Sequence, residues 1–168
     1  GLLIALEKMG ANIKILNKKI LAGEVVADIN VKSSELQGCE LDKEMAKLMI
    51  DEFPILSVAA SQAKTPSFFK GLDELRVKES DRLELINHNL NNCGCHSEIQ
   101  DDNLFINPSK NREILIPEVR TDFDHRIAMS FAVLASKIGK LKINESESIS
   151  TSFPTFREEF NTAGGNLS

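Results

Sequence analysis

Three places along the chain share one pattern of apolar and polar positions. An apolar residue is followed by three others, then by glycine, then by a short strand-like run; the places are 6–10, 90–94 and 160–164. Glycine readily adopts the left-handed conformation that ends many helices. We therefore predict that a helix ends at each of these glycines.

The wider pattern predicts helices that alternate with short strands. We expect helices at 1–9, 51–64, 80–93, 125–138 and 153–163, with residues 43–50 as a helical approach to Asp51. We expect strands at 12–17, 25–32, 36–41, 66–71, 96–100, 103–107, 114–118 and 140–145. Asp51 suits the N-cap of its helix, and Pro54 is tolerated in the first turn.

The spacing of these elements indicates an internal repeat. The interval from Asp51 to Glu79 equals the interval from Asp124 to Ser152, and each spans a similar order of elements. The repeated unit is strand, helix, strand, helix, and then one or two strands. We expect an α/β (α+β) fold built from such units.

Helices differ in which faces are apolar. Residues 54–63 and 128–136 are apolar or small nearly all round, which predicts helices inside the fold. The helix at 80–93 has a polar face formed by Asp81, Glu84, Asn87, His88 and Asn91. Residues 108–113 are expected to form a polar loop between units. The pattern thus predicts buried helices covered by sheets.

Composition narrows the class of protein. The 168 residues are 42% apolar and carry a net charge of −5, with no basic stripe, so nucleic acid is not an expected partner. No apolar run reaches 18 residues, so no membrane span is expected. The opening residues 1–6 resemble the tail of a helix whose beginning is missing, and we interpret the chain as a fragment of a longer protein.

Cysteine usage favours a reducing compartment, for which we expect the cytoplasm. Cys39, Cys93 and Cys95 make an odd number without the spacing of a disulfide framework. The run from Cys93 to His96 has no second cluster at zinc-like spacing, so we expect free thiols and no metal.

The segment 75–83 carries most of the candidate chemistry. It places three cations and two carboxylates between Arg76 and Arg82, where a strand-like run is expected to become a helix with Ser80 as its N-cap. One reading is a capped helix start with surface ion pairs, which stabilise little. The other is a cation cluster that binds phosphate or carboxylate while Glu79 moves a proton.

A second segment, 124–129, places Arg126 at the start of another apolar helix, beside His125. A guanidinium and free backbone N–H groups at one point form an anion socket. Asp124 and His125 also fit a plain cap and a surface histidine. His88 and His96 are given no role.

Together the segments resemble the C-terminal part of the EPSP synthases, the 3-phosphoshikimate 1-carboxyvinyltransferases. The resemblance covers essentially the whole chain, and the glyphosate-tolerant bacterial subgroup is the most similar, because of residues 50–56 and Ser152. The segments that carry it are 75–83 (Leu-Arg-Val-Lys-Glu-Ser-Asp-Arg-Leu), 124–129 (Asp-His-Arg-Ile-Ala-Met), 50–56 (Ile-Asp-Glu-Phe-Pro-Ile-Leu) and 151–154 (Thr-Ser-Phe-Pro).

The resemblance implies transfer of the enolpyruvyl group of phosphoenolpyruvate to the 5-hydroxyl of shikimate 3-phosphate, without metal or organic cofactor. It implies that Asp51 acts as base toward the shikimate hydroxyl and that Lys78 contacts shikimate 3-phosphate. It further implies that Glu79 moves protons at the phosphoenolpyruvate methylene carbon, and that Arg82 and Arg126 clamp that anion, with His125 nearby. Many members carry a phosphate-binding lysine where this chain has Ser152.

The implied fold has two similar domains, each built from three βαβαββ units with helices inside and sheets outside. Residues 1–168 then form most of the C-terminal domain, and the N-terminal domain is absent. The side chains at 51, 78, 79, 82 and 126 are expected to gather at one mouth. Alone, this half-site is expected to bind anions weakly, with negligible turnover.

Two alternatives remain open. A UDP-N-acetylglucosamine enolpyruvyltransferase shares the implied fold and reaction type, although the run at 76–82 favours the shikimate enzyme. A non-catalytic anion-binding module of the same fold is the other, and retention of Asp51 and Glu79 beside the cations argues against it.

Overall fold

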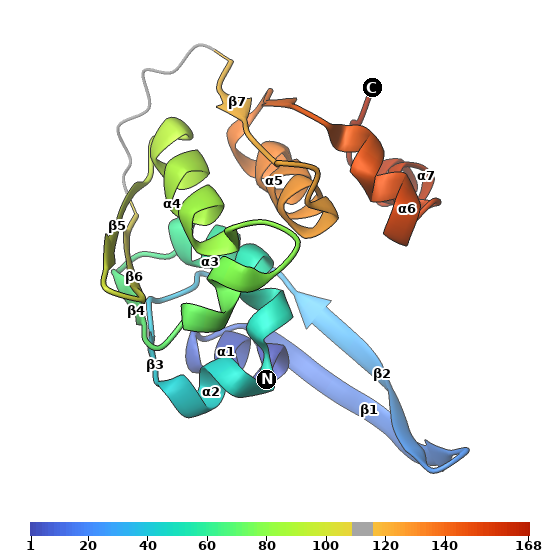
Figure 1. Cartoon of the computed structure of the whole chain (residues 1–168). Coiled ribbons are helices and arrows are strands. Elements are labelled where there is room, and N and C mark those ends of the chain that lie inside the picture. Colours follow the sequence, from blue (N-terminus) through green and yellow to red (C-terminus); the bar gives the residue numbers. More distant parts are fainter. Residues whose placement is uncertain (109–115) are drawn as a thin grey trace.

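A computed structural model describes residues 1–108 and 116–168. The predicted loop at 108–113 and the start of the predicted strand at 114–118 lie largely outside the described residues. Helices and short strands alternate along the chain (Figure 1), as the pattern predicts. None of the helices in these ranges is long and apolar enough to cross a membrane.

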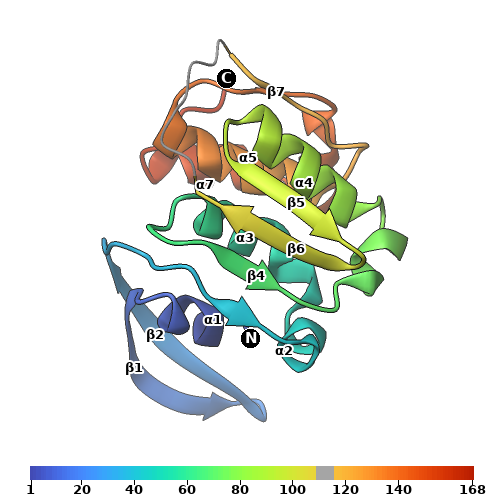
Figure 2. The same ribbon diagram turned by 90° about the vertical axis from the view of Figure 1, so that its left-hand side faces the viewer.

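One complete unit forms a four-stranded sheet with helices on one side (Figure 2). Its strands are β3 (Glu40–Leu41), β4 (Ser67–Phe69), β5 (His96–Gln100) and β6 (Asn103–Asn107). The order across the sheet is β3-β4-β6-β5, where β3 and β4 are parallel and the other neighbours are antiparallel. The crossover from β3 to β4 contains α2 (Lys43–Leu48) and α3 (Phe53–Ser61), and α4 (Arg82–Asn92) leads to the β5–β6 hairpin.

A second unit repeats the first half of this arrangement. Strands β7 (Glu118–Val119) and β8 (Lys142–Ile143) are parallel, and α5 (His125–Ile138) connects them. The short helices α6 (Ile149–Ser152) and α7 (Phe156–Thr162) follow, and α6 packs on α5. The repeat inferred from equal spacing is therefore confirmed for the strand–helix–strand part.

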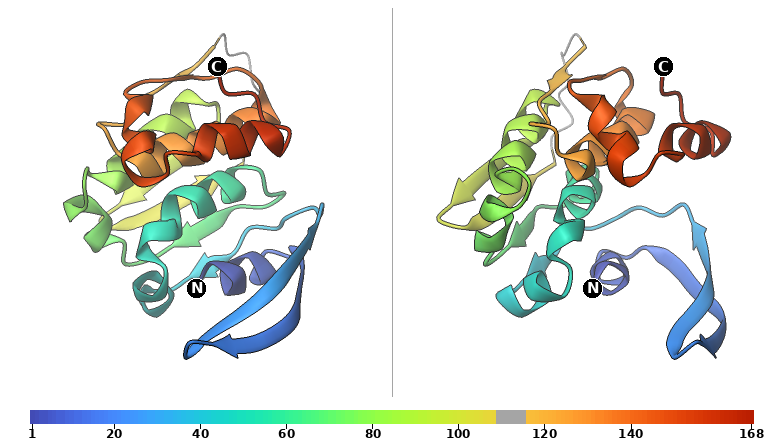
Figure 3. Two further views of the ribbon diagram at one scale, coloured as in Figure 1. Left: turned by 90° about the vertical axis from the view of Figure 1, so that its right-hand side faces the viewer. Right: turned by 45° about the vertical axis from the view of Figure 1, so that its right-hand side comes forward.

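Helices α3 and α5 pack against each other, and the four-stranded sheet lies behind them in the left view of Figure 3. Most of α3 is buried, including Phe53 and Leu56, so the expectation of an internal helix is confirmed. Helix α5 buries Phe131 and Leu134 but exposes Val133, so the helix expected inside the fold at 128–136 is buried on one side and open on another. Helix α3 therefore lies inside and the four-stranded sheet outside, as expected.

The chain opens with α1 (Leu2–Lys8) and a long two-stranded ribbon. Strands β1 (Asn12–Leu21) and β2 (Glu24–Lys32) are antiparallel, with a register shift between Leu16 and Lys19. The ribbon projects from the body of the molecule (Figure 1). Ile29 and Val31 on one of its faces are largely exposed, so this face has little cover in the described chain.

The three glycine caps are confirmed, because the glycines at 10, 94 and 164 have φ angles of 83°, 77° and 100°. Cys93 and Cys95 are buried, and Cys39 is partly buried.

Several predicted strands and helices are shorter than expected. The strand predicted at 36–41 is limited to Glu40–Leu41, because Pro66 on the facing segment has no N–H to donate and residue 38 lies against the Pro66 carbonyl. The strand predicted at 140–145 covers only β8, because Glu145 is left-handed with a φ of 45°. The helix predicted at 153–163 begins only at Phe156, because Pro154 disfavours helical geometry at Phe153, whose φ and ψ are −140° and 76°.

Candidate anion-binding site

The segment before α4 is a helical turn and then an extended residue, rather than the expected strand. Asp73–Val77 is a 3-10 helix, and Lys78 is extended. Asp81 is the N-cap of α4, because its carboxylate accepts a hydrogen bond from the Glu84 N–H. The expectation that Ser80 is the cap is therefore wrong. Arg82 is the first residue of α4.

Asp51 is not an N-cap either. It lies in a 3-10 turn, Ile50–Glu52, and the N-cap of α3 is Glu52. A carboxylate in this turn does not have to satisfy the backbone of α3. It faces cations from two other segments instead.

Cations from two distant segments converge on Asp51. Its Oδ1 lies 2.9 Å from Arg82 Nη1 and 3.4 Å from Lys78 Nζ. Its Oδ2 lies 3.9 Å from Arg126 Nη2, and its backbone carbonyl accepts a hydrogen bond from Arg126 Nη1 at 3.1 Å. The structure therefore brings together the side chains at 51, 78, 82 and 126, as expected.

Arg82 is enclosed by carboxylates. Its side chain is only 1% exposed. Besides Nη1 on Asp51, Nη2 donates to Glu79 Oε2, and Nε donates to Asp124 Oδ2 at 2.7 Å. A buried guanidinium needs such partners, because an unpaired buried charge is strongly destabilising. Three carboxylates of the chain itself thus hold the Arg82 guanidinium.

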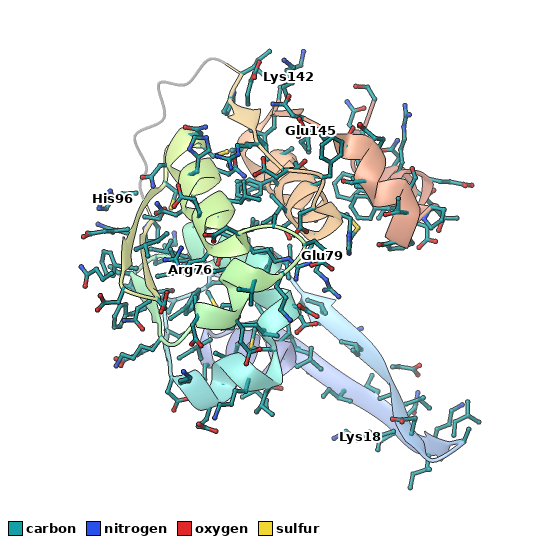
Figure 4. The ribbon with its side chains drawn as sticks, in the orientation of Figure 1. Lys18, Arg76, Glu79, His96, Lys142 and Glu145 are labelled. Atoms are coloured by element: carbon teal, nitrogen blue, oxygen red, sulfur yellow. The ribbon has the colours of Figure 1, made fainter. Side chains whose placement is uncertain are left out.

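The cations nearer to solvent are Arg126 and Lys78. Their side chains are 37% and 26% exposed. Glu79 lies on the loop before α4, on the side opposite to Arg76 (Figure 4). Its side chain is 56% exposed. An anion arriving from solvent therefore meets Lys78, Arg126 and Glu79 before it meets Arg82.

Asp124 is the residue whose role the sequence interpretation understated. It is buried and caps α5, because Oδ1 accepts from the backbone N–H groups of Arg126 and Ile127. Its Oδ2 binds Ser80 Oγ and Arg82 Nε. The cap was visible in the sequence, whereas the bond to Arg82 was not.

Asp51 and Asp124 are both held in the ionised form. Burial opposes ionisation of Asp51, but the hydrogen bond and charge of Lys78 and the charges of Arg126 and Arg82 outweigh it and lower the pKa. Burial likewise opposes ionisation of Asp124, and hydrogen bonds from Arg82 and Ser80 lower its pKa below the ordinary value. Each carboxylate can therefore act as a hydrogen-bond acceptor at neutral pH.

Three further residues lie at or beyond the border of this cluster. His125 is the half-buried first residue of α5, next to Arg126. Ser152 is exposed at the end of α6. Arg76 is held away by ion pairs with Asp102 and Asp81. In the described part of the chain, no three His, Cys, Asp or Glu side chains are arranged to hold a metal ion.

Comparisons with known proteins agree on one family. The family model described as EPSP synthase (3-phosphoshikimate 1-carboxyvinyltransferase) matches residues 1–160. The 3-phosphoshikimate 1-carboxyvinyltransferase of Paramagnetospirillum magneticum is 43% identical over 100% of this chain and 38% of its own length. The protein of that name from Pseudomonas sp. strain PG2982 is 41% identical over 94% of this chain and 36% of its own length.

Solved structures give the same result. An EPSP synthase from Acinetobacter baumannii superimposes with a TM-score of 0.85 and 35% identity, over 96% of this chain and 38% of that protein. The enolpyruvyl transferase NikO from Streptomyces tendae, with a TM-score of 0.63 and 15% identity, covers 98% of this chain and 35% of that protein and shares the fold alone. The chain thus spans less than two fifths of the length of these relatives. It belongs to the EPSP synthase family.

Proposed function

We propose that the chain supplies one side of the active site of an enzyme that transfers the enolpyruvyl group of phosphoenolpyruvate to the 5-hydroxyl of shikimate 3-phosphate and releases phosphate. The observation that carries the proposal is the convergence of Lys78, Arg82 and Arg126 on Asp51. Two phosphorylated, carboxylated substrates need several cations at one place, and each half-reaction needs a proton transfer. The relatives named above support the same reaction.

Lys78 and Arg126 are the cations that the substrates meet first. Lys78 binds the phosphate of shikimate 3-phosphate, and Arg126 binds phosphoenolpyruvate. Arg82 becomes available when an incoming anion replaces Glu79 at Nη2, because Glu79 is its most exposed partner. The displaced Glu79 carboxylate is then free to exchange protons with the methylene carbon of phosphoenolpyruvate. His125 lies at the border of this anion site.

Asp51 acts as the base toward the shikimate hydroxyl. Its pKa is lowered by Lys78, Arg126 and Arg82, which makes it a weak base. Anions bound to these cations offset their attraction for the carboxylate, and the pKa of Asp51 then rises. Substrate binding in this way strengthens the base at the moment when a proton must be accepted.

The proton transfers balance over two steps. In the addition step, Asp51 takes the hydroxyl proton as the oxygen bonds to the central carbon of phosphoenolpyruvate, and Glu79 delivers to the methylene carbon a proton that it has taken up from solvent. In the elimination step, the bond from the central carbon to the phosphate oxygen breaks, Glu79 takes a proton back from the resulting methyl group, and the proton held by Asp51 passes to the released phosphate. Neither step needs a redox partner.

We further propose that residues 1–168 form most of the C-terminal domain of a two-domain enzyme, and that an N-terminal domain completes the site. Two exposed apolar surfaces support the presence of a further domain that covers them. One is the exposed face of the β1–β2 ribbon. The other is a cavity of about 240 Å³ between α1, α3 and α5, lined by Leu2, Leu6, Ile55, Val58, Ala59 and Val133.

Alone, the chain is expected to bind phosphoenolpyruvate weakly and to show negligible turnover. The odd number of cysteines, without the spacing of a disulfide framework, favours the cytoplasm as its compartment.

A chimera tests the proposed reaction. The chain replaces the matching segment of the Paramagnetospirillum magneticum relative, and phosphate release is measured with both substrates. We expect turnover in the chimera and a large loss in Asp51→Asn and Glu79→Gln. A folded chimera without phosphate release, where the intact relative is active, would contradict the proposal.

The same assay addresses the alternatives. A non-catalytic module would leave the chimera folded and able to bind phosphoenolpyruvate but without turnover. Turnover with UDP-N-acetylglucosamine in place of shikimate 3-phosphate would favour the other transferase, although the relatives reported above are 3-phosphoshikimate 1-carboxyvinyltransferases.

A further inference from the structure

Asp124 connects the two helices that carry the arginines. Its Oδ1 accepts hydrogen bonds from the backbone N–H groups of Arg126 at 2.9 Å and Ile127 at 3.3 Å. Its Oδ2 accepts from Arg82 Nε at 2.7 Å and from Ser80 Oγ at 2.9 Å. One fully buried carboxylate therefore fixes both the first turn of α5 and the guanidinium at the start of α4.

The direction of the Arg82 guanidinium depends on this contact. The guanidinium is planar, and its donors form a rigid fork. Once Nε is bound to Asp124, the plane is set, and the two terminal nitrogens point to Asp51 and Glu79. Loss of the Nε contact leaves the fork free to turn, even when its charge is unchanged.

The segment before Asp124 is held unusually firmly. Asp122 and Phe123 have φ angles of 48° and 60°, a left-handed conformation that costs energy for residues other than glycine. The buried Asn89 binds both the backbone N–H and the carbonyl of Arg120. Thr121 Oγ1 donates to the carbonyl of residue 144. A strained backbone and buried hydrogen bonds thus hold the Asp124 carboxylate in place.

We infer that Asp124 is a positioning residue of the anion site: it does not touch the substrate, and it aims Arg82 while it anchors Arg126. The inference rests on the proposed function for the identity of the anion. A purely charge-balancing role predicts a different result. If Asp124 only balanced the charge of Arg82, removal of its negative charge would make the site more positive and would tighten anion binding. A positioning role predicts weaker binding, so the two accounts differ in sign.

The experiment uses the 168-residue chain and the variant Asp124→Asn, because asparagine keeps the capping ability of residue 124. Phosphoenolpyruvate affinity is measured by calorimetry, and the Nε–H resonance of Arg82 by NMR. We expect affinity to fall about tenfold or more and the Nε–H resonance to shift and exchange faster. Asp42→Asn, which changes the N-cap carboxylate of α2, is the matched control and leaves both readouts unchanged.

Ser80→Ala is the second variant, in case Asp124→Asn does not fold. It removes one hydrogen bond to Oδ2 and keeps the ion pair. We expect a smaller loss of affinity and a shifted Nε–H resonance, while Ser136→Ala, on the exposed side of α5, changes neither. Unchanged or tighter binding in a folded variant, or an unchanged resonance, would overturn the inference. Absence of any phosphoenolpyruvate affinity in the unaltered chain counts against the proposed function instead, and the resonance then decides whether Asp124 aims Arg82.

Discussion

A cation in the first turn of a helix is disfavoured by the helix dipole, yet Arg82 and Arg126 both stand there. Carboxylates at the same helix starts compensate, because Asp81 caps α4 and Asp124 caps α5. From the sequence, both arginines were expected to bind an anion that the chain does not itself supply. The structure adds that carboxylates of the chain itself contact Arg82 at that place.

The residue that competes most directly with a ligand is Glu79. We expect Glu79→Gln to tighten phosphoenolpyruvate binding to the isolated chain several-fold, because it removes a charged competitor from Arg82 Nη2. Calorimetry of the variant beside the exposed control Glu74→Gln measures this effect. Weaker binding in Glu79→Gln would mean that the carboxylate supports the anion site rather than blocking it.

Acid lability is expected from Asp51 and Asp124, whose pKa values are lowered in the folded state. A lowered folded-state pKa stabilises the fold above the unfolded value, about 3.9 for aspartate, and this contribution is lost as pH falls through the folded value. Urea unfolding between pH 6 and pH 3, roughly the span around that value, should show declining stability. Asp51→Asn should flatten the decline modestly, by less than about 1 kcal/mol, because its side chain is partly exposed. An unchanged slope in Asp51→Asn would contradict the lowered pKa of Asp51.

At the scale of elements, local signals located the helices better than they located the strands. The glycines that end helices and the apolar run of α3 act within a few residues, so they can be recognised in the sequence. Strand length depends on the partner strand, and Pro66 on a facing segment shortens β3 in a way that residues 36–41 do not reveal. The caps of α3 and α4 were each misplaced by one residue.

The burial of α3 makes a direct prediction for stability. Leu56 is fully buried, whereas Leu48 at the end of α2 is 67% exposed. We expect Leu56→Ala to cost about 2–5 kcal/mol in the free energy of unfolding, because it leaves a cavity. Leu48→Ala is the matched control and should cost less than about 0.5 kcal/mol. Equal costs in urea unfolding would show that α3 is not the internal helix described above.

At the scale of the whole molecule, the sequence pattern indicated repeated units with helices inside, and the second unit confirms the repeat as far as β8. The convergence of residues as far apart as 51 and 126 was expected from the resemblance to the family. Spacing alone does not reveal it, because no local rule links side chains 75 positions apart. The contact between Asp124 and Arg82 was missed for the same reason.

The β1–β2 ribbon leads to a prediction about association. Ile15 pairs with Ile29 and Ile13 with Val31 on one face, and the strand edges are unpaired within the described chain. Such surfaces favour self-association. Sedimentation of the isolated chain should show oligomers that increase with concentration and decrease in Ile29→Lys. Asn30→Lys, on the opposite face, adds the same charge and should retain them. A monomer at all concentrations would show that the apolar face of the ribbon does not cause self-association.

The central claim is that Lys78, Arg82 and Arg126 form one anion site around Asp51. Calorimetric titration of the 168-residue chain with phosphoenolpyruvate tests it most directly, with Arg126→Ala and Lys78→Ala compared with the exposed controls Arg157→Ala and Lys142→Ala. The account predicts weak saturable binding that each site variant lowers about tenfold and that neither control changes. Binding that is equally strong in the site variants and the controls would contradict it.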